Sequence, residues 1–84
     1  MDLFVDAYGL REKMDELDIT TGWDEAVGPM IARHTKSVRL RKGKLNVKVD
    51  SAPLRHELTF MREALIEILN RRAGRRVVVE IVLE

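Results

Sequence analysis

The chain has 84 residues, of which 45% are hydrophobic and 35% charged, with a net charge of +1; this is the composition of an ordinary soluble domain. The length predicts one domain, residues 1–84, with a single small core. The absence of cysteine excludes disulfides, thiolate zinc sites and thiol catalysis. No apolar run approaches the roughly 20 residues that cross a bilayer, and no signal peptide is present, so we expect a cytoplasmic protein that makes no membrane contact.

The charges are segregated along the chain. Residues 1–32 carry eight acids and two bases, whereas residues 33–76 carry thirteen bases and four acids. Seven Lys or Arg and no acid lie between Arg33 and Val49. Such a basic block favours an anionic partner. The alternative is that the acidic N-terminal segment folds back and neutralises the basic centre within the molecule.

Apolar spacing predicts two helices near the N-terminus, at residues 2–18 and 20–34. The apolar residues of the first recur at helical intervals; they are Leu3, Ala7, Leu10, Met14 and Leu17. Thr20-Thr21-Gly22 predicts a break, with either threonine capping the second helix. Trp23 heads the apolar face of that second helix, and we interpret it as a core anchor. Pro29 predicts a kink or a restart of the helix.

Residues 36–50 predict a basic β-hairpin. Two stretches alternate apolar and polar residues, and Lys42-Gly43 between them suits a tight turn. This register places Leu40 opposite Leu45 and Val38 opposite Val47, so both strands share one inward face. The basic side chains would collect on the outward face.

The C-terminal part predicts a long helix at 51–73, capped by Ser51 and stopped by Gly74, and then a strand at 76–83. Phe60 lies at the edge of the helix's apolar stripe. It would pack against the first or second helix or, alternatively, bind a partner. The strand would turn Val77, Val79, Ile81 and Leu83 inward. The order ααββαβ predicts an α+β fold, a three-stranded sheet with helices packed on one face.

Nothing in the sequence has the spacing of a catalytic site. His34 and His56 belong to no metal-binding or triad pattern, so we expect structural or solvated roles for both. Ser37 and Ser51 fall at a strand start and a helix cap. There is no glycine-rich phosphate loop and no carboxylate cluster. We therefore expect a protein that is not an enzyme and that has no metal site, no cofactor and no small-molecule substrate.

The basic hairpin and its approach are the candidate functional surface. Their cations would attract phosphates through counterion release, without reading sequence. The candidate nucleic-acid-binding residues are Arg33, Lys36, Arg39, Arg41, Lys42, Lys44 and Lys48. Glu80 and Glu84 could neutralise part of this face across the sheet. No Phe, Tyr or Trp lies between positions 24 and 59, so stacking on bases is poorly supported on the hairpin.

One stretch, Trp23-Asp-Glu-Ala-Val-Gly-Pro-Met-Ile-Ala-Arg-His-Thr35, resembles the opening signature of the DciA family. The resemblance continues through the hairpin, Ser51, the Leu54-Arg-His-Glu-Leu58 segment, Leu69-Asn70 and Gly74, and it covers about residues 10–84. It implies a K-homology-like fold and a non-enzymatic role in bacterial DNA replication. That role is to bind the replicative helicase, of DnaB type, and DNA, and to help the helicase load.

The chain departs from the related pattern in two ways. It has no GxxG loop, the phosphate clamp of K-homology RNA binders, and the sequence runs to Glu84 without the basic tail of many relatives. We therefore expect DNA binding that is weak or that depends on the partner. Two other functions fit the same residues: a general DNA- or RNA-binding module without a helicase role, and a purely protein-interaction domain.

Overall fold

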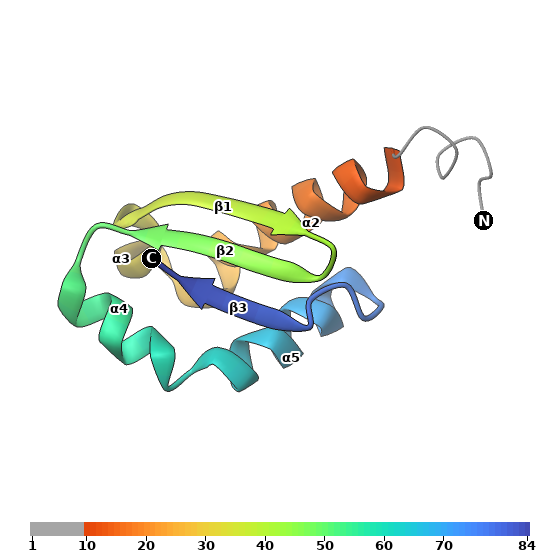
Figure 1. Ribbon diagram of the computed structural model, residues 1–84. Helices are drawn as coiled ribbons and strands as arrows, with labels where there is room; N and C mark the ends of the chain where they lie inside the picture. Colours follow the sequence, from red (N-terminus) through yellow and green to blue (C-terminus); the bar gives the residue numbers. More distant parts are fainter. Residues whose placement is uncertain (1–9) are drawn as a thin grey trace.

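The computed structural model of the protein describes residues 10–84. Its elements are α2 (Leu10–Val27), α3 (Pro29–Arg33), β1 (Thr35–Arg41), β2 (Lys44–Val49), α4 (Ala52–Thr59), α5 (Arg62–Ala73) and β3 (Glu80–Leu83). The sheet order is β1-β2-β3, with β1 and β2 antiparallel and β2 and β3 parallel. In Figure 1, α2 passes behind the sheet, and α4 and α5 follow the β3 side. The predicted α+β class with a three-stranded sheet is confirmed.

The first described helix is longer than predicted. α2 continues without a break through Thr20-Thr21-Gly22 and ends at Val27, so the predicted boundary between helices 2–18 and 20–34 is wrong. Ile19 and Trp23 are 1% and 0% exposed, and their burial outweighs the cost of about 1 kcal/mol for a helical glycine. The predicted restart at Pro29 is confirmed, since α3 begins there after Gly28.

The apolar face predicted for the first helix is also wrong in its described part. Met14 and Leu17 are 54% and 67% exposed, whereas the buried face of α2 is centred on Ile19 and Trp23. The expectations for Leu3 and Ala7 lie outside the described residues, and the side chain of Leu10 is not described either.

The hairpin forms in the predicted register. Leu40 faces Leu45, Val38 faces Val47 and Arg39 faces Asn46. Lys42 and Gly43 have φ values of 50° and 83°, which is the double positive-φ turn that matches strand twist. The inward side chains form the centre of the core; Leu40, Leu45, Val47 and Val49 are all buried.

The predicted long helix is two helices. Ser51 Oγ accepts a hydrogen bond from the Leu54 N–H at 3.4 Å, which confirms the cap, and Gly74 ends α5 with φ 78°. Between them, Phe60 and Met61 donate to the carbonyls of residues 57 and 58. These i→i−3 bonds tighten the chain and turn α5 away from α4. Phe60 lies on this turn and is 77% exposed, so the prediction that it packs against the first or second helix is wrong.

Asn70 fixes the segment that leads into β3. Its Oδ1 accepts from the N–H groups of Val77 and Val78 at 2.9 and 2.8 Å, and its Nδ2 donates to the Val78 carbonyl at 2.9 Å. Val78 is 0% exposed and Val79 is 55% exposed, which is the reverse of the predicted alternation. The strand itself begins at Glu80 rather than at residue 76, because Asn70 occupies the backbone groups before it.

Replacing Asn70 with alanine is expected to lower the free energy of unfolding by about 3 kcal/mol, since the N–H groups of Val77 and of the buried Val78, and the Val78 carbonyl, lose their partner. Urea denaturation followed by circular dichroism measures the loss. The Asn70→Asp variant is the matched control. It keeps the acceptor for both N–H groups and is expected to lose less. An Asn70→Ala protein as stable as the parent would contradict this role.

Candidate nucleic-acid interface

Most of the predicted basic residues share the outward face of the hairpin. Arg39 and Arg41 lie opposite Asn46 and Lys44, and Lys48 lies opposite Ser37. Lys42 lies in the turn between the strands. All five cations have exposed side chains. Because the apolar residues of both strands point to the core, the hairpin presents a nearly continuous positive surface, which we call the basic face.

The other two predicted residues lie apart from the basic face. Arg33 closes α3 and is exposed. Lys36 is the extra residue of a bulge between Thr35 and Ser37, where the β1–β2 register shifts. Its Nζ lies 3.2 Å from a carboxylate oxygen of Asp50, so the positive charge of Lys36 is already compensated.

Asp50 also pairs with His34, so that His34, Lys36 and Asp50 form one polar cluster. Its Nδ1 is 2.8 Å from Asp50 Oδ1, and the backbone N–H of Asp50 donates to the His34 carbonyl at 2.9 Å. The hydrogen bonds from His34 and then from Lys36 lower the pKa of the Asp50 carboxyl below its ordinary value. The cluster ties the start of β1 to the end of β2, so the structural role expected for His34 is confirmed, while His56 is exposed on α4.

Part of the basic centre is neutralised from within the molecule. The Arg39 Nε donates to Glu16 Oε2 at 3.0 Å, and the Leu40 N–H donates to the same oxygen at 3.0 Å. Two further acids of α2, Asp15 and Glu25, form ion pairs outside the hairpin. The alternative in which acidic residues fold back on the bases is therefore realised for one cation of the basic face.

Four cations of the basic face keep no acidic partner within the part of the chain that the structure describes; they are Arg41, Lys42, Lys44 and Lys48. Glu80 lies opposite Lys44 in the β2–β3 register, yet residues 10–84 contain no ion pair between them. Neutralisation by Glu80 and Glu84 across the sheet is thus absent from the described structure. A net positive surface is left on the hairpin.

Glu16 couples the basic face to α2 in a pH-dependent way. The hydrogen bond from Arg39 and then that from the Leu40 N–H lower its pKa below the ordinary value of 4.5. A lowered folded-state pKa contributes stability that is complete above pH 4.5 and is lost as the pH falls through the lowered value.

The Glu16→Gln variant is expected to be less stable than the parent at pH 7, and this difference is expected to shrink as the pH falls below 4.5. Parallel urea titrations of both proteins between about pH 7 and pH 3 measure it. Glu67→Gln serves as the control, because Glu67 forms only an exposed i,i+4 pair with Arg71. A stability difference for Glu16→Gln that is constant over this range would show that the carboxylate charge plays no part.

The predicted signature from Trp23 to Thr35 is a structural network. The fully buried Trp23 donates its indole N–H to Thr35 Oγ1 at 3.1 Å, and that hydroxyl donates to the Ile31 carbonyl at 2.8 Å. This chain of bonds joins α2, α3 and β1, which confirms Trp23 as a core anchor. This hydrogen bond therefore links the position of Trp23 in the core to Thr35 at the start of β1.

The sequence assigned no role to two residues that shape the surface. Glu16 decides which cation of the basic face is paired, and Asn70 decides which valines before β3 are exposed. An acid in a helix and an amide near a helix end carry no pattern that points to a distant partner.

Within residues 10–84, no group of three or more His, Cys, Asp or Glu side chains could hold a metal ion. None of the described helices is long and apolar enough to span a bilayer.

The fold and this surface define a small α+β domain with a positively charged, uncovered sheet face. The family described as Dna[CI] antecedent, DciA, matches residues 1–83. The chain belongs to the DciA family. It is also similar to a protein of Corynebacterium glutamicum (strain R) named UPF0232 protein, with 27% identity over 63 residues. That match covers 75% of this chain and 35% of the relative, so the chain spans about a third of that protein's length.

Proposed function

We propose that the domain is a DNA-replication accessory module that binds a replicative helicase of DnaB type together with DNA and assists helicase loading. Membership of the DciA family supports the helicase-related role. The observation that carries DNA contact is the basic face, on which Arg41, Lys42, Lys44 and Lys48 have no acidic partner among the described residues.

The chemistry of this surface favours contact with phosphates. Long, exposed Lys and Arg side chains on a flat, two-stranded ribbon neutralise backbone charge and release counterions, whatever the base sequence. The hairpin has no aromatic side chain on which bases could stack. Binding would therefore be sequence-nonspecific, with ATP hydrolysis left to the helicase.

Capture of the helicase tests the proposal. The immobilised domain, shown to be folded by circular dichroism, is incubated at low salt with the DnaB-type helicase of the same organism after nuclease treatment. The matched control is Arg41→Glu/Lys44→Glu, which reverses two charges of the basic face. The proposal predicts that the parent domain captures the helicase without DNA and that the variant binds DNA more weakly.

The other outcomes select the other two functions. A folded domain that binds DNA and RNA but captures no helicase would be a general nucleic-acid-binding module. A domain that binds neither nucleic acid at low salt would be a protein-interaction module, with its basic face directed at an acidic protein surface. Either result would contradict the proposed role.

A further inference from the structure

The two edge strands of the sheet, β1 and β3, differ in whether their outward backbone groups have hydrogen-bond partners. At the β1 edge, the Leu40 N–H is occupied by Glu16 of α2. At β3, the N–H groups of Glu80 and Glu84 donate towards β2, to the carbonyls of Gly43 and Val47. Successive peptide groups of a strand point to opposite sides, so those of Ile81 and Leu83 point to the outer edge. Unpaired edge groups of this kind are a template for another strand.

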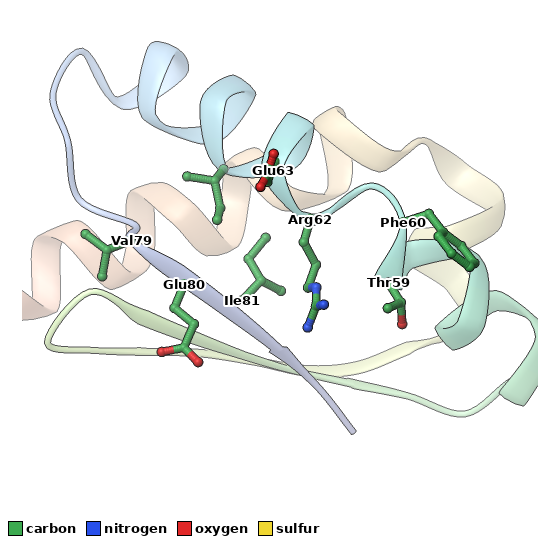
Figure 2. Close-up of a pocket in the computed structure, with 8 residues that line it drawn as sticks. Thr59, Phe60, Arg62, Glu63, Val79, Glu80 and Ile81 are labelled. Atoms are coloured by element: carbon green, nitrogen blue, oxygen red, sulfur yellow. The ribbon is translucent and has the colours of Figure 1, made fainter.

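The open edge of β3 borders a groove. One part of the groove is lined by Phe60, Ile66, Val79 and Ile81. The adjoining part is lined by Arg62, Val82 and Leu83. Figure 2 shows Ile81 pointing towards α5, whereas Glu80 points to the other side of the sheet. An added strand would therefore place alternate side chains in this groove and on the outward face of the sheet.

Phe60 gives the groove an exposed apolar wall. Its ring is 77% exposed and stands edge-to-face against His56, with ring centroids 5.1 Å apart. Val79, at the opposite end of the same groove, is 55% exposed. Two large apolar side chains left in water beside unpaired strand groups favour an occupant with apolar side chains of its own.

The charges on β3 disfavour a second copy of the chain as that occupant. Two copies could pair through their β3 strands in an antiparallel arrangement. In the register that bonds all the outward N–H and C=O groups, Ile81 of one copy would face Leu83 of the other. Glu80 would then lie directly opposite Glu84 on the outward face. Like charges directly opposite each other destabilise a strand pair. The same two carboxylates would attract a strand with basic side chains on that face.

We propose that the open edge of β3 binds an extended segment of a partner protein in which Lys or Arg alternates with apolar residues. Main-chain hydrogen bonds to Ile81 and Leu83 hold the segment as a fourth strand. Its apolar side chains enter the groove beside Phe60, and its basic side chains pair with Glu80 and Glu84. This site lies at the opposite edge of the sheet from the Glu16 contact and does not depend on DNA binding by the basic face.

Amide hydrogen exchange tests the proposal directly. The ¹⁵N-labelled domain is mixed with a capped peptide of alternating Lys and Val at about 1 mM, and exchange is followed by NMR. We expect the amides of Ile81 and Leu83 to slow about tenfold or more, while Val82, which already faces β2, changes little. A capped peptide of alternating Glu and Val should leave all three unchanged.

Two substitutions test whether the peptide binds beside Phe60 and Glu80. Phe60→Ala is expected to weaken the Lys-Val peptide about tenfold, whereas Met30→Ala, which truncates an equally apolar, 55% exposed side chain on α3, should have no effect. Glu80→Lys is expected to abolish the preference for the Lys-Val peptide over the Glu-Val peptide. The exposed Asp24→Lys makes the same charge change on α2 and should preserve that preference.

Four results would overturn the proposal. The first is unchanged exchange at Ile81 and Leu83 at the highest peptide concentration. The second is equal protection by the acidic peptide. The third is protection that rises with protein concentration alone, which would make a second copy the occupant. The fourth is protection by a single-stranded oligonucleotide in place of the peptide, which would make the groove a nucleic-acid site.

Discussion

Truncating Trp23 to alanine is expected to lower the free energy of unfolding by about 4 kcal/mol. The side chain is 0% exposed, and its removal leaves a cavity where α2, α3 and β1 meet. It also strands Thr35 Oγ1, which accepts the indole N–H at 3.1 Å. Native proteins have a total stability of roughly 5–15 kcal/mol, so this loss would remove a large fraction of the stability of the domain.

Urea denaturation followed by circular dichroism measures this effect, since the only tryptophan is lost with the substitution. Leu17→Ala on the same helix is the control. Leu17 is 67% exposed, and we expect a change within about 0.5 kcal/mol. A Trp23→Ala protein that kept its stability but lost helicase capture would show that the tryptophan serves a partner instead of the core.

Reversing Arg41 and Lys44 to glutamate is expected to weaken binding to a single-stranded oligonucleotide about 30-fold at low salt. It should also reduce the slope of log affinity against log salt by about 1.4, since each cation releases about 0.7 counterion from a single strand. These two residues face each other across the hairpin and have no acidic partner among the described residues. Fluorescence anisotropy with a labelled oligonucleotide measures both quantities, and different base sequences should give the same loss.

The Arg62→Glu/Arg71→Glu variant is the matched control. It makes the same change in net charge at two exposed positions of α5, away from the basic face. We expect only a small loss from the altered net charge. An equal loss in the control would move the DNA site from the hairpin to the α5 side of the molecule.

The hairpin was predictable because its determinants are local. Alternation fixes which residues face inward, and the Lys42-Gly43 pair fixes the turn, so the register follows from a short stretch of sequence. The Ser51 cap, the restart at Pro29 and the stop at Gly74 follow in the same way from the backbone chemistry of single residues.

The errors arose where tertiary contacts override local preference. Gly22 predicted a break, but burial of the neighbouring Trp23 carries α2 through it. No proline or glycine marks the turn at Phe60, so one helix was predicted where there are two. The three valines before Glu80 include no polar residue that would indicate which side chains face inward. Asn70 determines this through its hydrogen bonds to Val77 and Val78.

The composition of the basic face was predictable, but its pairing was not. The hairpin pattern alone places five cations outward. The compensation of Arg39 by Glu16 and of Lys36 by Asp50 depends on how α2 and a β-bulge meet the sheet. Such contacts between residues distant in the chain leave no periodic signal in one sequence.

The dependence of oligonucleotide affinity on salt tests the central claim, that the basic face binds the DNA backbone. Four cations without an acidic partner, each releasing about 0.7 counterion from a single strand, predict a slope of about −3 in log affinity against log salt. Anisotropy titrations of the parent domain at about 50 to 200 mM salt measure it. An affinity that does not change over this range would contradict the claim.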